Sequence, residues 1–229
     1  AVGEATIKAG AKNAFVVKEP ILAAIGAGVP IYEPQGHMLV DIGGGTIDVA
    51  VISLGGIVNS KNLTIDGDKL NSDISSYIRD EFKILVGERT AESIKMSVGS
   101  ITEGDEPLEA PVRGRDLVTG LPREVIITDS DVREAIGPSI STLVDSIKEV
   151  LETTPPEILS DVMKRGIIIV GGGALIKGLD SLISELLKVP VHIASDPLSA
   201  VARGTGVVLE DIDKHKEILV NYDDDSAPR

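Results

Sequence analysis

The feature that most constrains the fold of this 229-residue chain is a run of three glycines between two carboxylates. Asp41 ends one apolar segment and Asp48 opens the next, and between them lie Gly43, Gly44, Gly45 and Thr46. This pattern predicts a strand, a tight turn and a second strand. Successive glycines let backbone N–H groups approach an anion, whereas a carboxylate beside phosphate needs a cation or a water between them. The hairpin could therefore grip a metal-bound nucleotide phosphate, or its glycines could only make the turn. The stretch alone slightly favours the second interpretation, because Gly-rich turns are common.

A second glycine run favours the nucleotide interpretation. The apolar segment 166–170 is followed by Gly171, Gly172 and Gly173, and then by a helical pattern. Glycines that precede a helix can pass close to a flat ring or an anion. Two such turns facing each other would form a nucleotide cleft. Neither a P-loop nor a GxGxxG dinucleotide motif is present, so such a cleft belongs to another architecture.

Three charged residues are candidates for the same cleft, although spacing alone favours ordinary structural roles for them. Glu92 and Lys95 lie three residues apart on a predicted helix. They form either a surface ion pair or contacts to a ribose and a base. Glu19 lies just before a predicted helix, where it either favours the helix dipole or orients a water for attack on phosphate. The three histidines are scattered and suggest no metal site.

Composition excludes several classes of function. The chain carries 22 Lys and Arg against 36 Asp and Glu, a net charge of −14, which argues against nucleic acid and against a polybasic membrane patch. With no cysteine it forms no disulfide and no thiolate site, which fits a reducing cytoplasm. No apolar run approaches the ~20 residues of a membrane-spanning helix.

Periodicity predicts alternating helices and strands. Gly10 ends a first helix. Ser130 caps a later helix, which Gly137-Pro138 breaks. Asp196-Pro197 starts the last helix, and Gly204 and Gly206 within that helix indicate close packing. The predicted strands are 14–17, 38–42, 47–53, 57–65, 110–113, 124–127, 166–170 and 191–194, with 38–65 as an antiparallel meander. The other predicted helices are 20–26, 69–82, 90–98, one ending at 152 and one around 179–187.

Several motifs together resemble one superfamily. Asp41–Asp48 (DIGGGTID) resembles the second phosphate motif of the actin and heat-shock-chaperone ATPases, Glu19–Gly26 resembles their first connecting helix, and Gly171–Leu175 their adenosine motif. Four further strings, at 52–58, 87–92, 113–122 and 154–157, resemble the bacterial actins of the MreB family. The resemblance runs from about residue 1 to about residue 212.

The resemblance implies an α/β fold, namely an actin-like (ribonuclease H-like) lobe with a small inserted α+β subdomain. Residues 1–35 would end the first lobe, 36–68 and 160–215 would form the base of the second, 69–159 the insertion, and 216–229 a disordered tail. The family's first phosphate hairpin and the subdomain with its membrane-inserting loop have no counterpart here, so the N-terminal lobe is largely absent.

The resemblance also implies a function. Members of the family bind ATP with Mg²⁺, polymerise with themselves, and lie in the cytoplasm at the inner face of the cell membrane, where they organise wall synthesis and rod shape with membrane proteins. Hydrolysis would be slow in the intact protein, and we expect this chain alone to bind ATP weakly and to hydrolyse it negligibly. The membrane contact would belong to the absent lobe. A chaperone-type ATPase and a small-molecule kinase of the same superfamily are the alternatives, although the 115–122 string argues against the chaperone.

Roles for single residues follow from the resemblance by position. Phosphates would contact Gly43, Gly44, Gly45 and Thr46, and magnesium would bind Asp41 through water. Glu19, assisted by Thr46, would orient the attacking water. The nucleoside would contact Glu92, Lys95, Gly171, Gly172, Gly173, Ala174 and Leu175.

Two positions depart from the family pattern. Ile47 stands where the family usually has a threonine, which would remove a hydroxyl near the γ-phosphate and puts hydrolysis in question. Asp66-Gly67 replaces the family's usual pair of small residues before the helix at Lys69, and Asp66 would bring a carboxylate near the phosphate oxygens unless it points away.

Overall fold

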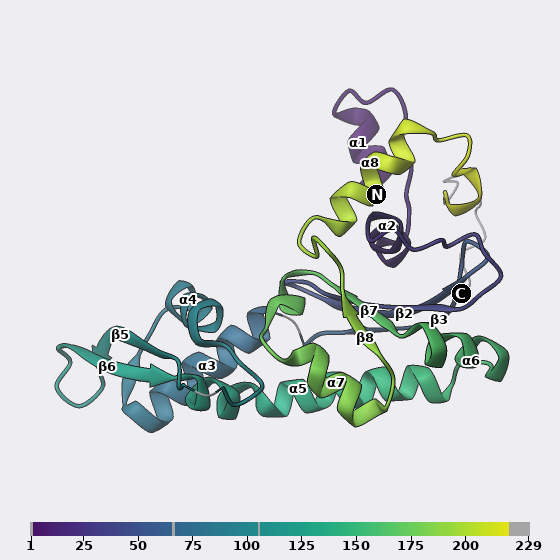
Figure 1. Ribbon diagram of the computed structural model, residues 1–229. Helices are drawn as coiled ribbons and strands as arrows, with labels where there is room; N and C mark the ends of the chain where they lie inside the picture. The colour runs from purple at the N-terminus through teal and green to yellow at the C-terminus, as the bar shows by residue number, and fades with distance from the viewer. Residues whose placement is uncertain (1, 66, 105, 220–229) are drawn as a thin grey trace.

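A mixed five-stranded sheet forms the centre of the computed structural model, which describes residues 2–65, 67–104 and 106–219 (Figure 1). The strand order is β3-β2-β1-β7-β8. The strands are β1 His37–Ile42, β2 Ile47–Ser53, β3 Gly56–Leu63, β7 Ile167–Val170 and β8 Val191–Ile193. The first three form the predicted antiparallel meander, and β7 and β8 extend the sheet in parallel from β1.

Alternating side chains give the sheet two buried faces. Val40 and Ile42 lie in the core beneath α5 (Asp129–Glu152), α6 (Pro156–Arg165) and α7 (Leu179–Leu187). Leu39, one residue out of phase, lies in a second core with α2 (Glu19–Gly26) and α8 (Ala200–Glu210). Helices therefore cover both faces, as Figure 1 shows.

A smaller α+β subdomain, as expected, extends from one end of the central sheet (Figure 1). It comprises α3 (Gly67–Phe82), β4 (Ile84–Leu85), α4 (Glu88–Val98), β5 (Glu109–Asp116) and β6 (Pro122–Thr128). Its strands form a separate antiparallel sheet, β4-β5-β6. The helix α5 packs on α3 and α4 and also on β2 and β3, so it belongs to both subdomains and one core runs continuously through them.

The helix α2 packs on the central sheet. Its Ile21, Ala23 and Ala24 share a core with Leu39 and Ala50 of the sheet. The resemblance places α2 at the end of the first lobe, and that assignment stays a prediction.

The helices α2 and α8 cross with their backbones in contact. A Cβ at Gly204 would lie 1.9 Å from the carbonyl oxygen of Leu22, and one at Gly26 would lie 1.7 Å from that of Ala200. The close packing predicted for α8 is therefore confirmed at Gly204. At Gly206 it is wrong, because a Cβ there meets nothing within 4 Å.

Three helix predictions are wrong. Pro138 does not break α5, which is continuous from Asp129 to Glu152. Thr128 rather than Ser130 caps that helix, in a capping box in which Asp131 is the second partner. The last helix starts at Ala200, not at Asp196-Pro197. The helix α6 was not predicted at all.

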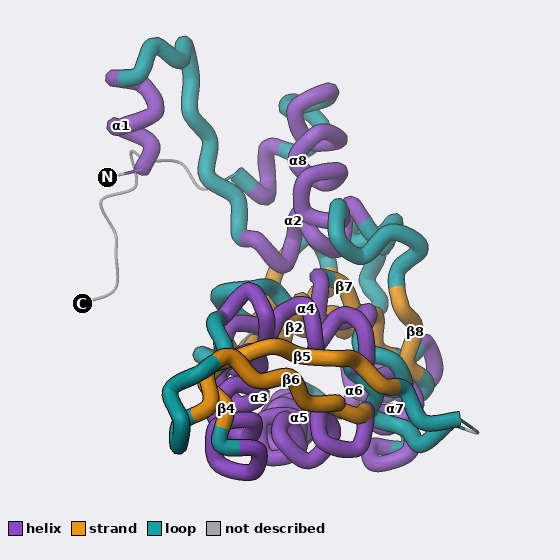
Figure 2. The backbone as a smooth tube through the Cα atoms, turned by 90° about the vertical axis from the view of Figure 1, so that its left-hand side faces the viewer, coloured by secondary structure: helices purple, strands orange, loops and turns teal. Residues whose placement is uncertain are grey.

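Both ends of the described chain also differ from expectation. The helix α1 (Val2–Lys8) lies apart from the main body (Figure 2). The buried strand predicted at 14–17 is absent from this segment, where Phe15 is 45% exposed and Val16 makes an isolated bridge. The disorder predicted from residue 216 is wrong at its start, because Lys216–Ile218 forms a 3-10 helix, η2, with Ile218 buried. The rest of that prediction, 220–229, lies outside the described residues, as does Asp66. None of the helices within the described ranges is both long and apolar enough for a membrane span.

Candidate functional site

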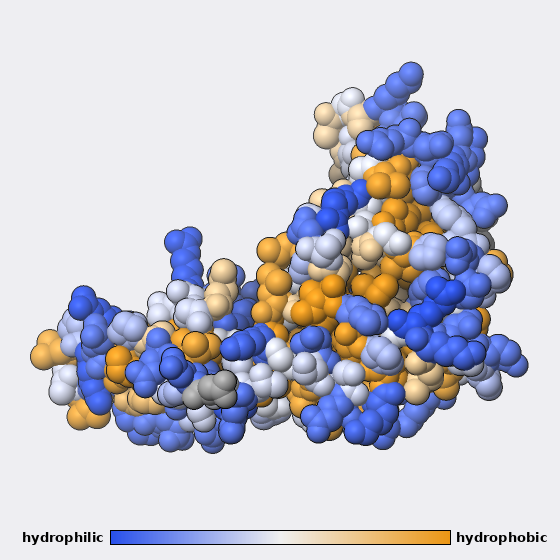
Figure 3. Space-filling model, viewed as in Figure 1, coloured by the Kyte–Doolittle hydropathy of each residue, from blue (hydrophilic) through white to orange (hydrophobic). Residues whose placement is uncertain are grey.

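The two glycine turns lie side by side at one edge of the central sheet. Strands β1 and β7 are parallel neighbours, and Asp41 pairs with Val170. Each strand is followed by its glycine run, so Gly43 and Gly171 leave the sheet at the same edge. Gly67 at the start of α3 contacts the first turn, which places both turns at the inner corner between the sheet and the insertion (Figure 1). Figure 3 shows this corner as concave, with a largely hydrophobic wall on the side of the sheet.

The second turn needs its glycines for packing. Gly171 has φ +81°, and a Cβ there would lie 2.4 Å from the carbonyl oxygen of Ile42 and 2.5 Å from Oδ1 of Asp41. A Cβ at Gly173 would lie 2.1 Å from Cγ2 of Ile42. Any larger residue would push the two turns apart.

The first turn contains glycines that the fold does not require. The N–H of Gly43 donates to the carbonyl of Thr46 at 3.0 Å and closes the turn. Gly44 and Gly45 are exposed, have no left-handed φ, and a Cβ on either would meet nothing within 4 Å. The absent side chains therefore leave open space on the outside of the turn, as a bulky ligand would require.

A buried carboxylate stands where the strand enters this turn. Asp41 is 7% exposed, and burial, then Glu19 and then Asp48, raise its pKa from 3.8 to about 6. Asp48 lies opposite Asp41 in the strand pair and accepts a hydrogen bond of 2.9 Å from Nδ2 of Asn62. Glu19 is exposed at the start of α2. An anion at this edge would be repelled unless a cation accompanied it.

The insertion supplies a positive charge beside the same turn. Lys95, half-buried on α4, donates from Nζ to the carbonyl of Gly67 at 3.0 Å. Glu92 lies one turn earlier on α4 and is exposed. Lys95 therefore reaches the structure around the first turn, whereas the ribose role expected for Glu92 stays a prediction.

Two exposed leucines lie at the second turn, one on it and one in the loop before α8. Residues Gly172–Leu175 form a 3-10 helix, η1, instead of opening a longer helix directly. Leu175 is 56% exposed and Leu198 70% exposed, and a Cβ at Gly172 would lie 3.5 Å from Cδ2 of Leu198. Ala174 points into the core and is fully buried, so it could offer a ligand only its backbone.

Ile47 does not lie where the sequence analysis placed it. Its side chain is 2% exposed and belongs to the core with Ile42, on the face of the sheet opposite Asp41. The expectation that this position presents a group to the phosphates is therefore wrong. The isoleucine side chain fills the core, so its presence does not remove a hydroxyl group from the corner.

Two residues of the corner were not predicted from the sequence to contribute to the site. Gly67 stood out only as part of a departure from the family pattern, and Leu198 was not considered. The sequence signal that could have indicated Leu198 is an apolar residue directly after Asp196-Pro197. The loop that carries it is held at the second turn, because the carbonyl of Pro197 accepts a hydrogen bond of 2.9 Å from the N–H of Gly171.

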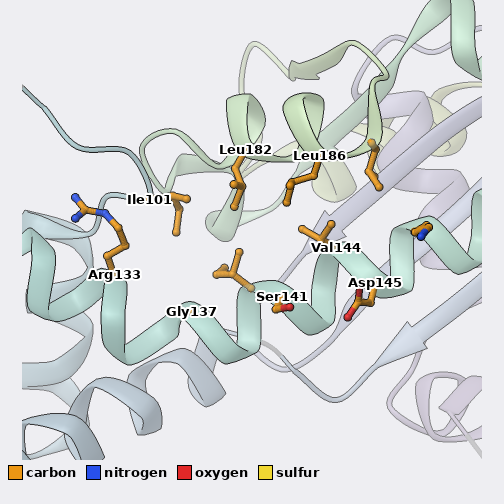
Figure 4. A pocket seen from close by; sticks show the side chains of 11 residues that line it. Ile101, Arg133, Gly137, Ser141, Val144, Asp145, Leu182 and Leu186 are labelled. Atoms are coloured by element: carbon orange, nitrogen blue, oxygen red, sulfur yellow. The ribbon is translucent and has the colours of Figure 1, made fainter.

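A separate groove of about 420 Å³ lies between α5 and α7 (Figure 4). Val144, Leu182 and Leu186 point into it, with Arg133 and Asp145 at its rim. It lacks a glycine turn and lies away from Asp41, so we do not associate it with the corner.

Comparison with known proteins decides the family. The model of the family described as MreB/Mbl protein matches residues 1–217. This chain belongs to the MreB/Mbl family. The cell shape-determining protein Mbl of Bacillus subtilis is 50% identical over 214 residues, which are 93% of this chain and 64% of that protein. MreB of Escherichia coli K12 is 46% identical over 215 residues, 94% of this chain and 62% of that protein.

Solved structures show that the MreB/Mbl chain has the actin-like fold. MreB5 of Spiroplasma citri bound to AMPPNP superimposes with a TM-score of 0.91 at 39% identity, over 94% of this chain and 65% of that one. The same protein bound to ADP matches equally well, with a TM-score of 0.91. The MamK double helical filament shares the fold with a TM-score of 0.71 at 24% identity, over 85% of this chain and 59% of that one. Relative to the Bacillus subtilis protein, the chain spans about 64% of the full length.

Proposed function

We propose that this chain provides one wall of an ATP-binding cleft in an actin-like protein that polymerises. The observation that carries the proposal is that the two glycine turns follow paired strands and so lie side by side at one edge of the sheet, beside a buried carboxylate. Gly44 and Gly45 leave open space there that the fold itself does not use. The AMPPNP-bound and ADP-bound MreB5 structures, which share this fold, support a nucleotide as the ligand.

In this proposal the first turn holds the phosphates and the second holds the base. Backbone N–H groups of Gly43–Thr46 would bind the phosphates. Leu175 and Leu198, both exposed beside Gly172, would pack on the adenine. Glu92 would accept from the ribose hydroxyls, and Glu19 would orient a water with Thr46.

Magnesium fits the donors at this edge. Asp41 offers carboxylate oxygens, which are the ligands that Mg²⁺ prefers, and a cation would relieve the repulsion among Asp41, Glu19 and Asp48. Within the described ranges no three acidic or histidine side chains are placed to bind one metal ion. Water and phosphate oxygens would therefore complete the coordination, with Asp41 acting through water. Bound there, the ion would neutralise phosphate charge.

The larger role we propose is the determination of cell shape. The relatives from Bacillus subtilis and Escherichia coli are named cell shape-determining proteins. A protein that carries this lobe would form filaments at the inner membrane face together with wall-synthesis proteins. Slow ATP hydrolysis would time filament assembly, and this chain alone would bind ATP weakly and hydrolyse it negligibly.

Sedimentation tests the proposal. A version of the chain extended to the full length of its relatives should pellet with Mg-ATP and stay in the supernatant without nucleotide. The same version with Gly44→Ala should require far more ATP. Sedimentation that ignores nucleotide, or turnover of a small phosphate acceptor without any pelleting, would contradict the proposal.

A further inference from the structure

Two hydrogen bonds connect the insertion to the first glycine turn, and a third joins two helices of the insertion beside it. Nζ of Lys95 donates to the carbonyl of Gly67 at 3.0 Å. The N–H of Gly67 donates to the carbonyl of Gly43 at 3.1 Å, and the N–H of Asp68 donates to the carbonyl of Gly44 at 3.1 Å. The first turn of α3 therefore lies between α4 and the glycine turn and is bonded to both.

Lys95 and Gly44 are bonded to opposite ends of one peptide group. The carbonyl of Gly67 and the N–H of Asp68 belong to the same peptide unit, whose oxygen accepts from Lys95 and whose N–H donates to Gly44. A cation on the oxygen polarises the peptide and strengthens the N–H as a donor. Lys95 therefore strengthens the bond that holds Gly44 without touching Gly44 itself.

The fit around Gly67 makes this connection stiff. Gly67 is buried, and a Cβ on it would lie 3.3 Å from the Gly43 oxygen, 3.3 Å from Cα of Gly44 and 3.5 Å from Nζ of Lys95. The glycine thus lets α3 lie directly against the turn, within the reach of the lysine. Gly44 is exposed on its outer side, so these inner contacts determine where its backbone stands.

We propose that Lys95 is a positioning residue, which fixes the phosphate-binding turn through the Gly67–Asp68 peptide and so links the insertion to the phosphates. The inference rests on the proposed nucleotide function of the turn. It differs from the role that the sequence suggested, in which Lys95 contacts the ribose and base. A positioning role affects the phosphates most, whereas a base contact affects every adenosine ligand equally.

The test uses the 229-residue chain and Lys95→Met, which keeps an apolar stem and removes the donor. Arg89→Met is the matched control, because Arg89 is an exposed cation on the same helix. Without nucleotide, exchange of the Gly67 and Asp68 amides should accelerate about tenfold in Lys95→Met, from the loss of one charge-assisted hydrogen bond. Arg89→Met should exchange like the wild type, and Lys95→Arg, which keeps a donor, should retain most of the protection.

Ligand affinity gives the second measurement. With magnesium present, Lys95→Met should lose about tenfold in affinity for ATP, less for ADP, and less than about twofold for adenosine. An equal loss for all three ligands, or unchanged amide exchange, would overturn the positioning role. If the wild type bound none of the three, the proposed function would fail for this chain, while the exchange experiment would still decide whether Lys95 holds the turn.

Discussion

Substitution of Gly204 tests the backbone contact between α2 and α8. In Gly204→Ala the new Cβ would lie 1.9 Å from the Leu22 carbonyl oxygen, whereas ordinary contact begins near 3.4 Å. The helices would have to separate by roughly 1.5 Å, because a backbone oxygen cannot rotate away as a side chain can. That separation would loosen the core that Ile21 and Val208 share.

The expected cost is the difference between two effects. Overpacking costs about 1–3 kcal/mol, here at the upper end, and alanine regains about 1 kcal/mol over glycine in a helix. Gly204→Ala should therefore lose about 2 kcal/mol, which lowers the Tm of a chain of this size by about 4–8 °C. Gly206→Ala lies in the same helix with nothing within 4 Å, so it should gain about 0.5–1 kcal/mol.

Thermal and urea unfolding of the two variants measure this difference. If Gly204→Ala proved as stable as Gly206→Ala, the helices could not be in backbone contact, and the packing of α2 on the sheet would have to be revised. A loss in both variants would instead indicate that Gly206 also faces a neighbour.

Three further substitutions test local features by thermal or urea unfolding. Asp41→Asn should stabilise the chain at pH 7.5 and much less at pH 4.5. The pKa of Asp41 is raised from 3.8 to about 6 in the fold, so the penalty for its charge is absent below 3.8, grows between the two values and is complete above 6. An equal gain at both pH values would show that this charge is not the cause. The N–H groups of Thr119 and Val118, together with other hydrogen bonds, lower the pKa of Asp116 to about 2. Asp116→Asn should therefore destabilise the chain at pH 7, and the difference from the wild type should disappear as pH falls through 2. A pH-independent difference would refute the electrostatic explanation. Thr128→Ala should lower the free energy of unfolding by about 1 kcal/mol, because it removes the cap of α5. A neutral Thr128→Ala would contradict this capping role.

The strands of the central sheet and both glycine turns could be predicted from the sequence, because a buried strand is a continuous apolar run that glycine or a polar turn interrupts. The continuity of α5 could not. Pro138 is exposed, so its ring faces solvent, while Ile136 and Ile140 on either side are buried. The burial of the two isoleucines outweighs the cost of proline inside a helix, about 3 kcal/mol.

For the site, the sequence indicated which residues gather but not how each one is oriented. The alternation of β2 could have shown that Ile47 faces away from Asp48, since neighbouring residues of a strand point to opposite faces. The contact of Lys95 with Gly67 depends on how α3 and α4 pack, which no local pattern determines. The raised pKa of Asp41 likewise depends on burial, and on the carboxylates of Glu19 and Asp48 that the fold brings close to it.

We propose above that nucleotide phosphates bind in the open space beside Gly44. The most direct test is a titration of Mg-ATP into the 229-residue chain and its Gly44→Ala variant. Gly137→Ala is the control, because a Cβ there also meets nothing within 4 Å but lies on α5, away from the turn. If phosphates bind there, Gly44→Ala should have an unchanged Tm and an ATP affinity reduced by about tenfold or more, while Gly137→Ala should keep the wild-type affinity. Wild-type ATP affinity in Gly44→Ala would contradict it.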